Sequence, residues 1–105
     1  MLLDIQLNDE GNVLTVKVDG DIDVNSVRQL RKSLEESIEK DKPSITLDCK
    51  KLNYIDSTGL GVLVSLLKQV QQYEGSIRII ALKPYLNKIF EVTGLTNIFD
   101  IEVAD

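Results

Sequence analysis

Apolar residues recur along this chain at two different spacings, and the order in which these spacings follow one another restricts the fold more than any other feature. Apolar and polar residues alternate over 2–8 and 12–20, and the turn-forming sequence DEGN lies between them, so these segments predict an antiparallel hairpin. After the hairpin, segments with helical spacing of three and four residues alternate with short strand-like segments. This order is typical of a sheet with parallel crossovers covered by helices.

The remaining elements are predicted as three helices and three strands. The helices are expected at about 24–40, from the segment YIDSTGLGVLV (54–64) to near Tyr73, and at 84–92; the strands are expected at 44–49, 76–82 and 99–103. Asp23 or Asn25 is the expected cap of the first helix. Gly94 is expected to end the third helix in a left-handed conformation, with Leu95 making the accompanying apolar contact. The predicted fold class is α/β, with a small mixed sheet in one domain of residues 1–105.

Charge and composition argue against several functions. The net charge is −5 and basic residues occur in nothing larger than short pairs, which argues against binding to nucleic acid or to an anionic membrane. The longest apolar stretch, 60–67, is far shorter than the ~20 residues of a membrane-spanning helix. The start of the chain, MLLDIQLNDE, lacks the features of a signal peptide, so we expect a cytoplasmic protein. The single Cys49 is expected to be a buried apolar residue beside Ile45 and Leu47.

The segment DSTGLG (56–61) allows two interpretations. A serine or aspartate directly before an apolar helix normally caps it, so Ser57 is expected to serve at least as a cap. Capping does not explain Gly59 and Gly61, because glycine within a helix costs up to ~1 kcal/mol relative to alanine. These two glycines indicate either close packing of the helix on the sheet or the approach of a partner to the Ser57 hydroxyl.

Catalysis at Ser57 is disfavoured by the rest of the sequence. The chain has no histidine, so a Ser-His-Asp arrangement is impossible, and no lysine motif accompanies the serine. The segment also lacks the Gly-Lys-Ser/Thr ending of a phosphate-binding loop. Asp21, Asp48 and Lys83 match a two-component receiver only in part, because a single helix separates the strands of Asp48 and Lys83. We therefore expect no enzyme activity, no cofactor and no metal site.

Three segments together resemble the bacterial anti-sigma-factor antagonists, which are small proteins made of a STAS domain. The segments are YIDSTGLGVLV, GDIDV (20–24) and FEVTGL (90–95), and the match covers essentially the whole chain. The resemblance implies a STAS fold and a partner-switching role in transcription regulation, in stress response or sporulation. It implies that an anti-sigma factor that is also a serine kinase phosphorylates Ser57. The unphosphorylated protein would bind that kinase and release its sigma factor, and a PP2C-like phosphatase would reset the phosphorylated form.

The resemblance also assigns roles to individual residues. Ser57 would be the phosphate acceptor, with Thr58 as the second choice. The partner-binding residues would be Asp23, Asp56, Thr58, Gly59, Leu60 and Gly61. A phosphate adds −1.5 to −2 charges beside Asp56, so phosphorylation would repel an acidic partner surface. We expect the free protein to be a monomer.

Two alternatives stay open at this point. The chain is also consistent with a STAS subunit that binds its partner constitutively in a signalling or transport assembly, with Ser57 as a helix cap only. In the first helix, Arg28, Arg31 and Lys32 precede the acidic residues, the less favourable order for a helix. This charged face is either a solvated surface or a surface that contacts a partner.

Overall fold

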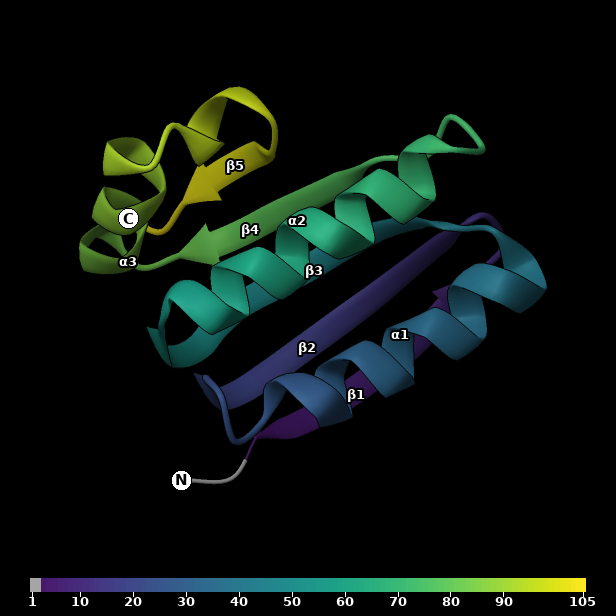
Figure 1. Cartoon of the computed structure of the whole chain (residues 1–105), viewed down its shortest axis with the longest axis horizontal. Helices are drawn as coiled ribbons and strands as arrows, with labels where there is room; N and C mark the ends of the chain where they lie inside the picture. The colour runs from purple at the N-terminus through teal and green to yellow at the C-terminus, as the bar shows by residue number, and fades with distance from the viewer. Residues whose placement is uncertain (1–2) are drawn as a thin grey trace.

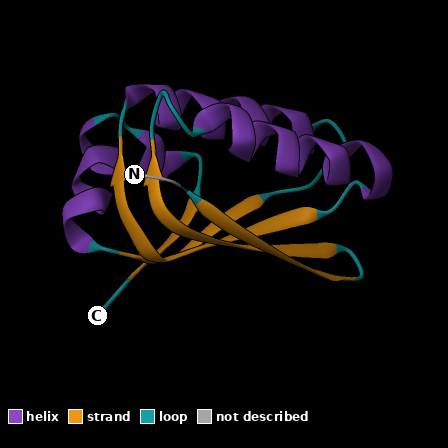
Figure 2. Ribbon diagram, turned by 90° about the horizontal axis from the view of Figure 1, so that it is seen from below, coloured by secondary structure: helices purple, strands orange, loops and turns teal. Residues whose placement is uncertain are grey.

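A five-stranded mixed sheet with helices on one face forms the computed structural model, which describes residues 3–105 (Figures 1 and 2). The strands are β1 (Asp4–Glu10), β2 (Val13–Ile22), β3 (Ser44–Ile55), β4 (Ile77–Leu82) and β5 (Asp100–Val103), in that spatial order. The helices are α1 (Val27–Asp41), α2 (Ser57–Gln71) and α3 (Pro84–Val92), followed by a short 3₁₀ helix, Leu95–Asn97. The β1–β2 pair is antiparallel and the other pairs are parallel, which confirms the predicted α/β class. Leu2, part of the first predicted strand, lies outside the described residues.

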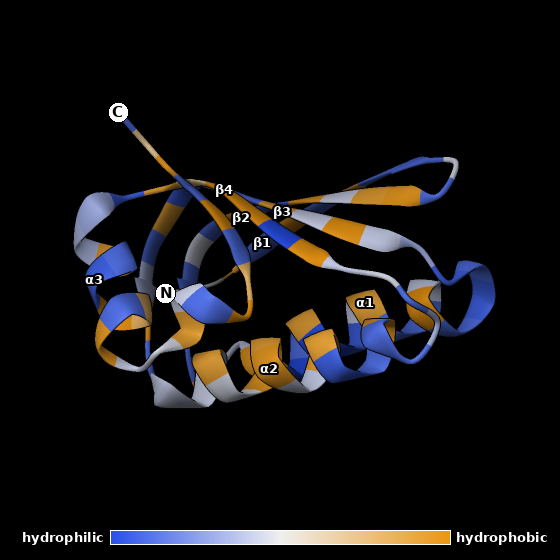
Figure 3. Cartoon of the chain, turned by 90° about the horizontal axis from the view of Figure 1, so that it is seen from above, coloured by the Kyte–Doolittle hydropathy of each residue, from blue (hydrophilic) through white to orange (hydrophobic). Residues whose placement is uncertain are grey.

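The core lies between the sheet and the apolar sides of the helices, mainly α1 and α2, with Leu86 and Phe90 of α3 at its edge (Figure 3). Alternate residues of β2 are buried, as are the residues of α1 at helical spacing: Leu14, Val16, Val18 and Ile22, and Leu30, Leu34 and Ile38. The helix α2 buries a wider stripe, because it lies over the middle of the sheet. Cys49 is 1% exposed, as predicted. Within residues 3–105, no helix is both long enough and apolar enough to span a bilayer.

The parallel arrangement places the starts of all three helices at one end of the molecule (Figure 1). Each helix follows directly after one of the parallel strands β2, β3 and β4, so it begins where the carboxyl end of its strand lies. This end is formed by residues 20–28, 53–62 and 83–86. We call it the acceptor end, because it contains Ser57, the residue that is expected to accept a phosphate. Segments that are far apart in the sequence meet there, as ligand sites commonly do in sheets of this kind.

Strand β3 is longer than predicted, since it continues beyond Cys49 to Ile55. Its pairing with β2 shifts twice, once after Lys17 and once after Gly20, so that β3 contains extra residues at each shift. Such bulges break the alternation of buried and exposed side chains. The buried residues of β3 accordingly change from a spacing of two to a spacing of three at Cys49, Leu52 and Ile55.

The start of α1 also differs from the prediction. The helix begins at Val27, and neither Asp23 nor Asn25 caps it. The Asp23 carboxylate instead accepts a hydrogen bond from the backbone N–H of Asn25, at 2.9 Å. The buried Ser26 hydroxyl accepts from the N–H of Asp23 at 3.0 Å and donates to the carbonyl of Asp21 at 2.7 Å. The residues before α1 therefore form an internally bonded turn. At the other end of the chain, Gly94 is left-handed, with φ of 76°, as predicted.

Candidate functional site

The acceptor end brings two of the predicted site segments together. Ile22 and Ile55 are register partners at the ends of β2 and β3, and the Asp56 N–H donates to the Ile22 carbonyl at 3.2 Å. Asp23 and Ser57 directly follow these bonded residues, so the turn before α1 adjoins the start of α2. The segment FEVTGL, by contrast, lies at the end of α3 and contributes buried Phe90 to the core.

Asp56, and not Ser57, caps α2. The Asp56 backbone is extended, and its carboxylate accepts a hydrogen bond from the Gly59 N–H at 2.9 Å. Ser57 is the first helical residue and is exposed to solvent. Among residues 3–105, its hydroxyl has no hydrogen-bond partner. The expectation that Ser57 acts as the cap is thus wrong, because the Asp56 carboxylate takes this role through its bond with the Gly59 N–H.

This division between cap and hydroxyl predicts different stabilities for two alanine variants. Asp56→Ala is expected to lower the free energy of unfolding by about 1 kcal/mol, because it removes a side-chain cap. Ser57→Ala is expected to change it by less than about 0.5 kcal/mol, as is usual for an exposed side chain without special contacts. Urea unfolding followed by circular dichroism measures both values. Equal losses in the two variants would contradict the assignment of the cap.

The two glycines of the segment differ in the space around them. A Cβ atom on Gly59 would lie 2.7 Å from the Ile22 carbonyl oxygen and 2.8 Å from Ile55 Cγ1, so this glycine lets α2 pack closely on the ends of β2 and β3. Gly61 is exposed, and a Cβ atom there would have no neighbour within 4 Å. Packing therefore explains Gly59 and leaves Gly61 without a structural reason.

Of the other predicted contact residues, Thr58 is exposed and Leu60 is not. The Leu60 side chain is 7% exposed and belongs to the core. Gly59 is also buried, so the outer surface of the segment consists of Ser57, Thr58 and Gly61, with Asp56 partly exposed beside them. A partner that touches this segment would meet two hydroxyl groups, one carboxylate and a bare stretch of helix backbone.

Two contacts that the sequence did not reveal hold the end of β3 from the side of α3. The Lys83 ammonium donates to the Asn53 side-chain oxygen at 2.8 Å, and the Tyr85 hydroxyl donates to the Asn53 carbonyl at 2.6 Å. These partners are about 30 residues apart in the chain, and no local pattern marks such pairs. They fix the strand that leads into Asp56 and Ser57.

Residues 3–105 offer little support for a metal site or for a reactive thiol. No three potential ligands from His, Cys, Asp and Glu lie close enough together to bind a metal ion in this part of the chain. Burial, together with the neighbouring Asp48 charge, raises the pKa of the Cys49 thiol to about 12, so it remains protonated and unreactive at neutral pH. The arrangement at the acceptor end suits binding and modification of a hydroxyl group.

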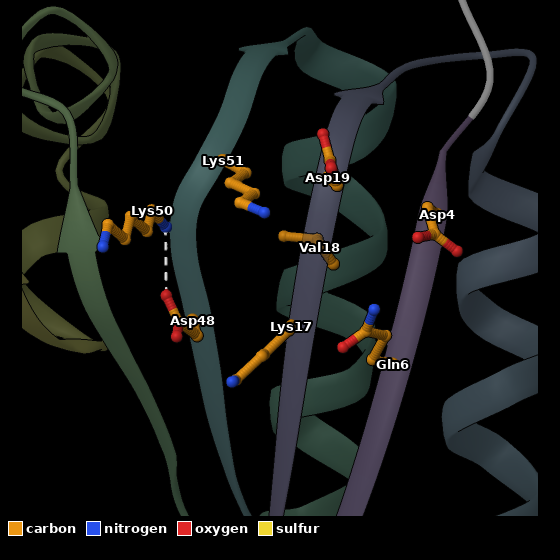
Figure 4. Close-up of a pocket in the computed structure, with 8 residues that line it drawn as sticks. All are labelled: Asp4, Gln6, Lys17, Val18, Asp19, Asp48, Lys50 and Lys51. Carbon is orange, nitrogen blue, oxygen red and sulfur yellow. Dashed lines mark hydrogen bonds between the residues drawn. The ribbon is translucent and has the colours of Figure 1, made fainter.

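A hollow on the opposite, helix-free face of the sheet carries balanced charges (Figure 4). It has a volume of about 220 Å³ and forms where the β3 bulge lies beside β2. Its lining includes three lysines and three aspartates: Lys17, Lys50 and Lys51, and Asp4, Asp19 and Asp48. Because these opposite charges offset one another, the hollow has no clear preference for an anion or a cation.

Comparison with known proteins places this geometry in a family. Residues 4–104 match the family model described as the STAS domain. Over 101 residues the chain is 35% identical to the anti-sigma-B factor antagonist of Bacillus subtilis (strain 168), covering 96% of this chain and 92% of that protein. It is 30% identical over 101 residues to the anti-sigma-B factor antagonist of Staphylococcus aureus (strain NCTC 8325), covering 96% and 94% of the two chains.

Solved structures share the fold at lower identity. An anti-sigma factor antagonist from Mycobacterium paratuberculosis superposes with a TM-score of 0.84 at 22% identity, covering 95% of this chain and 85% of that one. The Bacillus cell fate determinant SpoIIAA in its phosphorylated form superposes with a TM-score of 0.75 at 20% identity, covering 95% and 92%. At such identities the likeness shows a common fold.

Proposed function

The chain belongs to the STAS domain family, and from this premise we propose that it is an anti-sigma factor antagonist that phosphorylation of Ser57 switches off. In its unphosphorylated form it binds an anti-sigma factor, which thereby releases its sigma factor. The anti-sigma factor is also the serine kinase that modifies Ser57, and a PP2C-like phosphatase reverses the modification. The protein itself acts by binding, in the cytoplasm, and catalyses no reaction.

The observation that carries this proposal is the exposed Ser57 hydroxyl, which has no hydrogen-bond partner among residues 3–105. Because Asp56 caps the helix, the hydroxyl can enter a kinase active site without loss of a structural hydrogen bond. The start of α2 also tolerates a phosphate, since free N–H groups and the positive end of the helix dipole favour an anion there. The names of the two relatives with 35% and 30% identity support the antagonist role.

The switch follows from charge. The kinase transfers the terminal phosphoryl group of ATP to Ser57 Oγ, which loses its proton, and ADP leaves. The new group carries −1.5 to −2 charges next to the Asp56 carboxylate. A surface that already contains Asp23 and Asp56 then repels carboxylates of the partner and becomes more costly to desolvate. The phosphatase hydrolyses the phosphate ester and restores the hydroxyl.

Phosphate mapping tests this function directly. The purified chain is incubated with the anti-sigma factor kinase of the same organism and Mg-ATP, and the modified residue is located by mass spectrometry. We expect phosphate on Ser57 and none on the Ser57→Ala variant, with Thr58→Ala as the control that leaves the acceptor intact. Phosphate on neither Ser57 nor Thr58 would refute the switch. Phosphate on Thr58 alone would move the acceptor by one residue.

A further inference from the structure

A groove between the first halves of α1 and α2 has features that the fold does not require. Its lining residues are Val24, Asn25, Val27, Arg28, Arg31 and Val62, around a volume of about 630 Å³, and we call it the helix groove. The two helices lie side by side and both start at the acceptor end (Figure 1). Val24 follows Asp23 directly, and Val62 is five residues after Ser57, so the groove begins beside the phosphate acceptor.

The floor of the helix groove is apolar and partly open to solvent. The Val24 side chain is 67% exposed, although it is the kind of residue that normally lies in a core. Val27 is half-buried, and Val62 closes the bottom with 7% exposure. Next to Val62, Gly61 has open space where a side chain would be. An apolar side chain from outside can therefore reach both helices.

Most charged side chains of α1 stand in the order that the helix dipole disfavours. Its first half carries Arg28, Arg31 and Lys32, and its second half carries four acidic residues and one basic residue: Glu35, Glu36, Glu39 and Asp41, and Lys40. A helix dipole favours acidic side chains at its start and basic ones at its end, at roughly 0.3–1 kcal/mol for each charge. Arg28 in the first turn and the acidic majority of the second half oppose this preference, whereas Lys40 in the last turn follows it. Exceptions to local rules are expected where function requires them.

The two arginines of the helix groove are not both used within the fold. Arg31 lies 3.6 Å from the Glu35 carboxylate and 3.3 Å from the Ser65 hydroxyl. Arg28 is exposed and forms no ion pair with any residue from 3 to 105. The lining contains these two cations and no acidic residue, in a chain whose net charge is −5. The surface is therefore complementary to an acidic segment.

We infer that the helix groove binds a segment of the anti-sigma factor in which carboxylates flank an apolar side chain. The apolar group would lie on Val24, Val27 and Val62. One carboxylate would pair with Arg28, and a second would share Arg31 with Glu35. This inference rests on the proposed function and names a docking surface beyond the acceptor segment.

A phosphate on Ser57 would also act on the helix groove, through its charge. Arg28 supplies a positive charge that no carboxylate of residues 3–105 pairs with, whereas Arg31 already faces Glu35, and a phosphate on Ser57 brings −1.5 to −2 charges to the same end of the molecule. Phosphorylation would then cancel most of the attraction that the groove exerts on the acidic segment. The same modification that blocks contact at Ser57 would also weaken docking along the helices.

Matched pairs of surface variants test the helix groove. Arg28→Glu reverses a groove charge, and Lys32→Glu makes the same change on an exposed part of α1 outside the groove. Val24→Asp adds a charge to the groove floor, and Val92→Asp does so at a site that is 78% exposed on α3. Binding of the purified anti-sigma factor kinase is measured by calorimetry for each variant, with Ser57→Asp as the reference for the switch. Circular dichroism verifies that every variant is folded.

We expect Arg28→Glu and Val24→Asp each to weaken binding about tenfold, and the two control variants to stay within about twofold of the wild type. If the groove variants bind like the wild type while Ser57→Asp does not, the docking surface is refuted and the proposed function stands. Equal weakening by the groove and control variants would refute the docking surface too, since general charge would then explain the effect. A wild-type chain that fails to bind the kinase would refute both proposals.

Discussion

The Ser57→Asp variant is expected to bind the anti-sigma factor about 100-fold more weakly than the wild type, a difference of about 2.7 kcal/mol. The physical reason is the position of residue 57 at the acceptor end, where the new carboxylate would stand beside those of Asp56 and Asp23. Three carboxylates in one small area repel an acidic partner and hold water strongly. Isothermal titration calorimetry with the purified kinase, at fixed ionic strength, measures the change.

Ser57→Asn is the matched control for that experiment. Asparagine has nearly the same shape as aspartate and carries no charge, so it separates charge from size. We expect Ser57→Asn to retain binding within about tenfold of the wild type, well above the affinity of the aspartate variant. If both variants bind like the wild type, residue 57 does not control the interface. The chain would then fit the alternative of a constitutive STAS subunit.

The second large effect concerns stability. Gly59→Ala is expected to lower the free energy of unfolding by about 1–3 kcal/mol, because its methyl group would meet the rigid Ile22 carbonyl at 2.7 Å. Gly61→Ala is expected to raise it by up to ~1 kcal/mol, because alanine favours the helix and open space surrounds the site. The same substitution, two residues apart in one helix, should thus have opposite signs.

Urea unfolding of the wild type and the two variants, followed by circular dichroism, measures this contrast. Gly59→Ser provides a further check, since a larger group at position 59 should destabilise at least as much as alanine does. Similar losses at 59 and 61 would contradict the packing assigned to Gly59. Because Gly61 lies on the exposed surface beside Ser57 and Thr58, Gly61→Ala should weaken binding of the kinase even as it stabilises the fold.

The order of elements could be predicted from the sequence because each element carries its own periodicity. Alternation in β2 and helical spacing in α1 and α2 are local properties, and the residues that are buried in the fold are those that these patterns predict. The second half of β3 could not be predicted in this way. Its two bulges arise from pairing with β2, and they shift the buried residues from a spacing of two to one of three. A period search along one strand does not detect such a change.

The sequence predicted which segment would form the candidate site, but it did not predict the role of each residue in it. The DSTGLG segment indicated a helix start with unusual glycines, but more than one nearby side chain was of a type that can cap a helix. Asp56 takes that role in α2, whereas Asp23 and Asn25 form a turn before α1 with Ser26. The two glycines look alike in the sequence, and only the position of Ile22 distinguishes them. Lys83 and Tyr85 depend on contacts with a distant strand.

The separate roles of Asp56 and Ser57 bear on how long the protein survives in a cell. Since the cap belongs to Asp56, phosphorylation of Ser57 removes no capping hydrogen bond. The helix dipole favours the phosphate and the Asp56 carboxylate repels it, so the two effects offset each other and the population of unfolded molecules should change little. Proteases that capture unfolded chains would then degrade the modified and unmodified pools at the same rate. The ratio of the two pools would report the relative rates of kinase and phosphatase, without distortion from selective turnover.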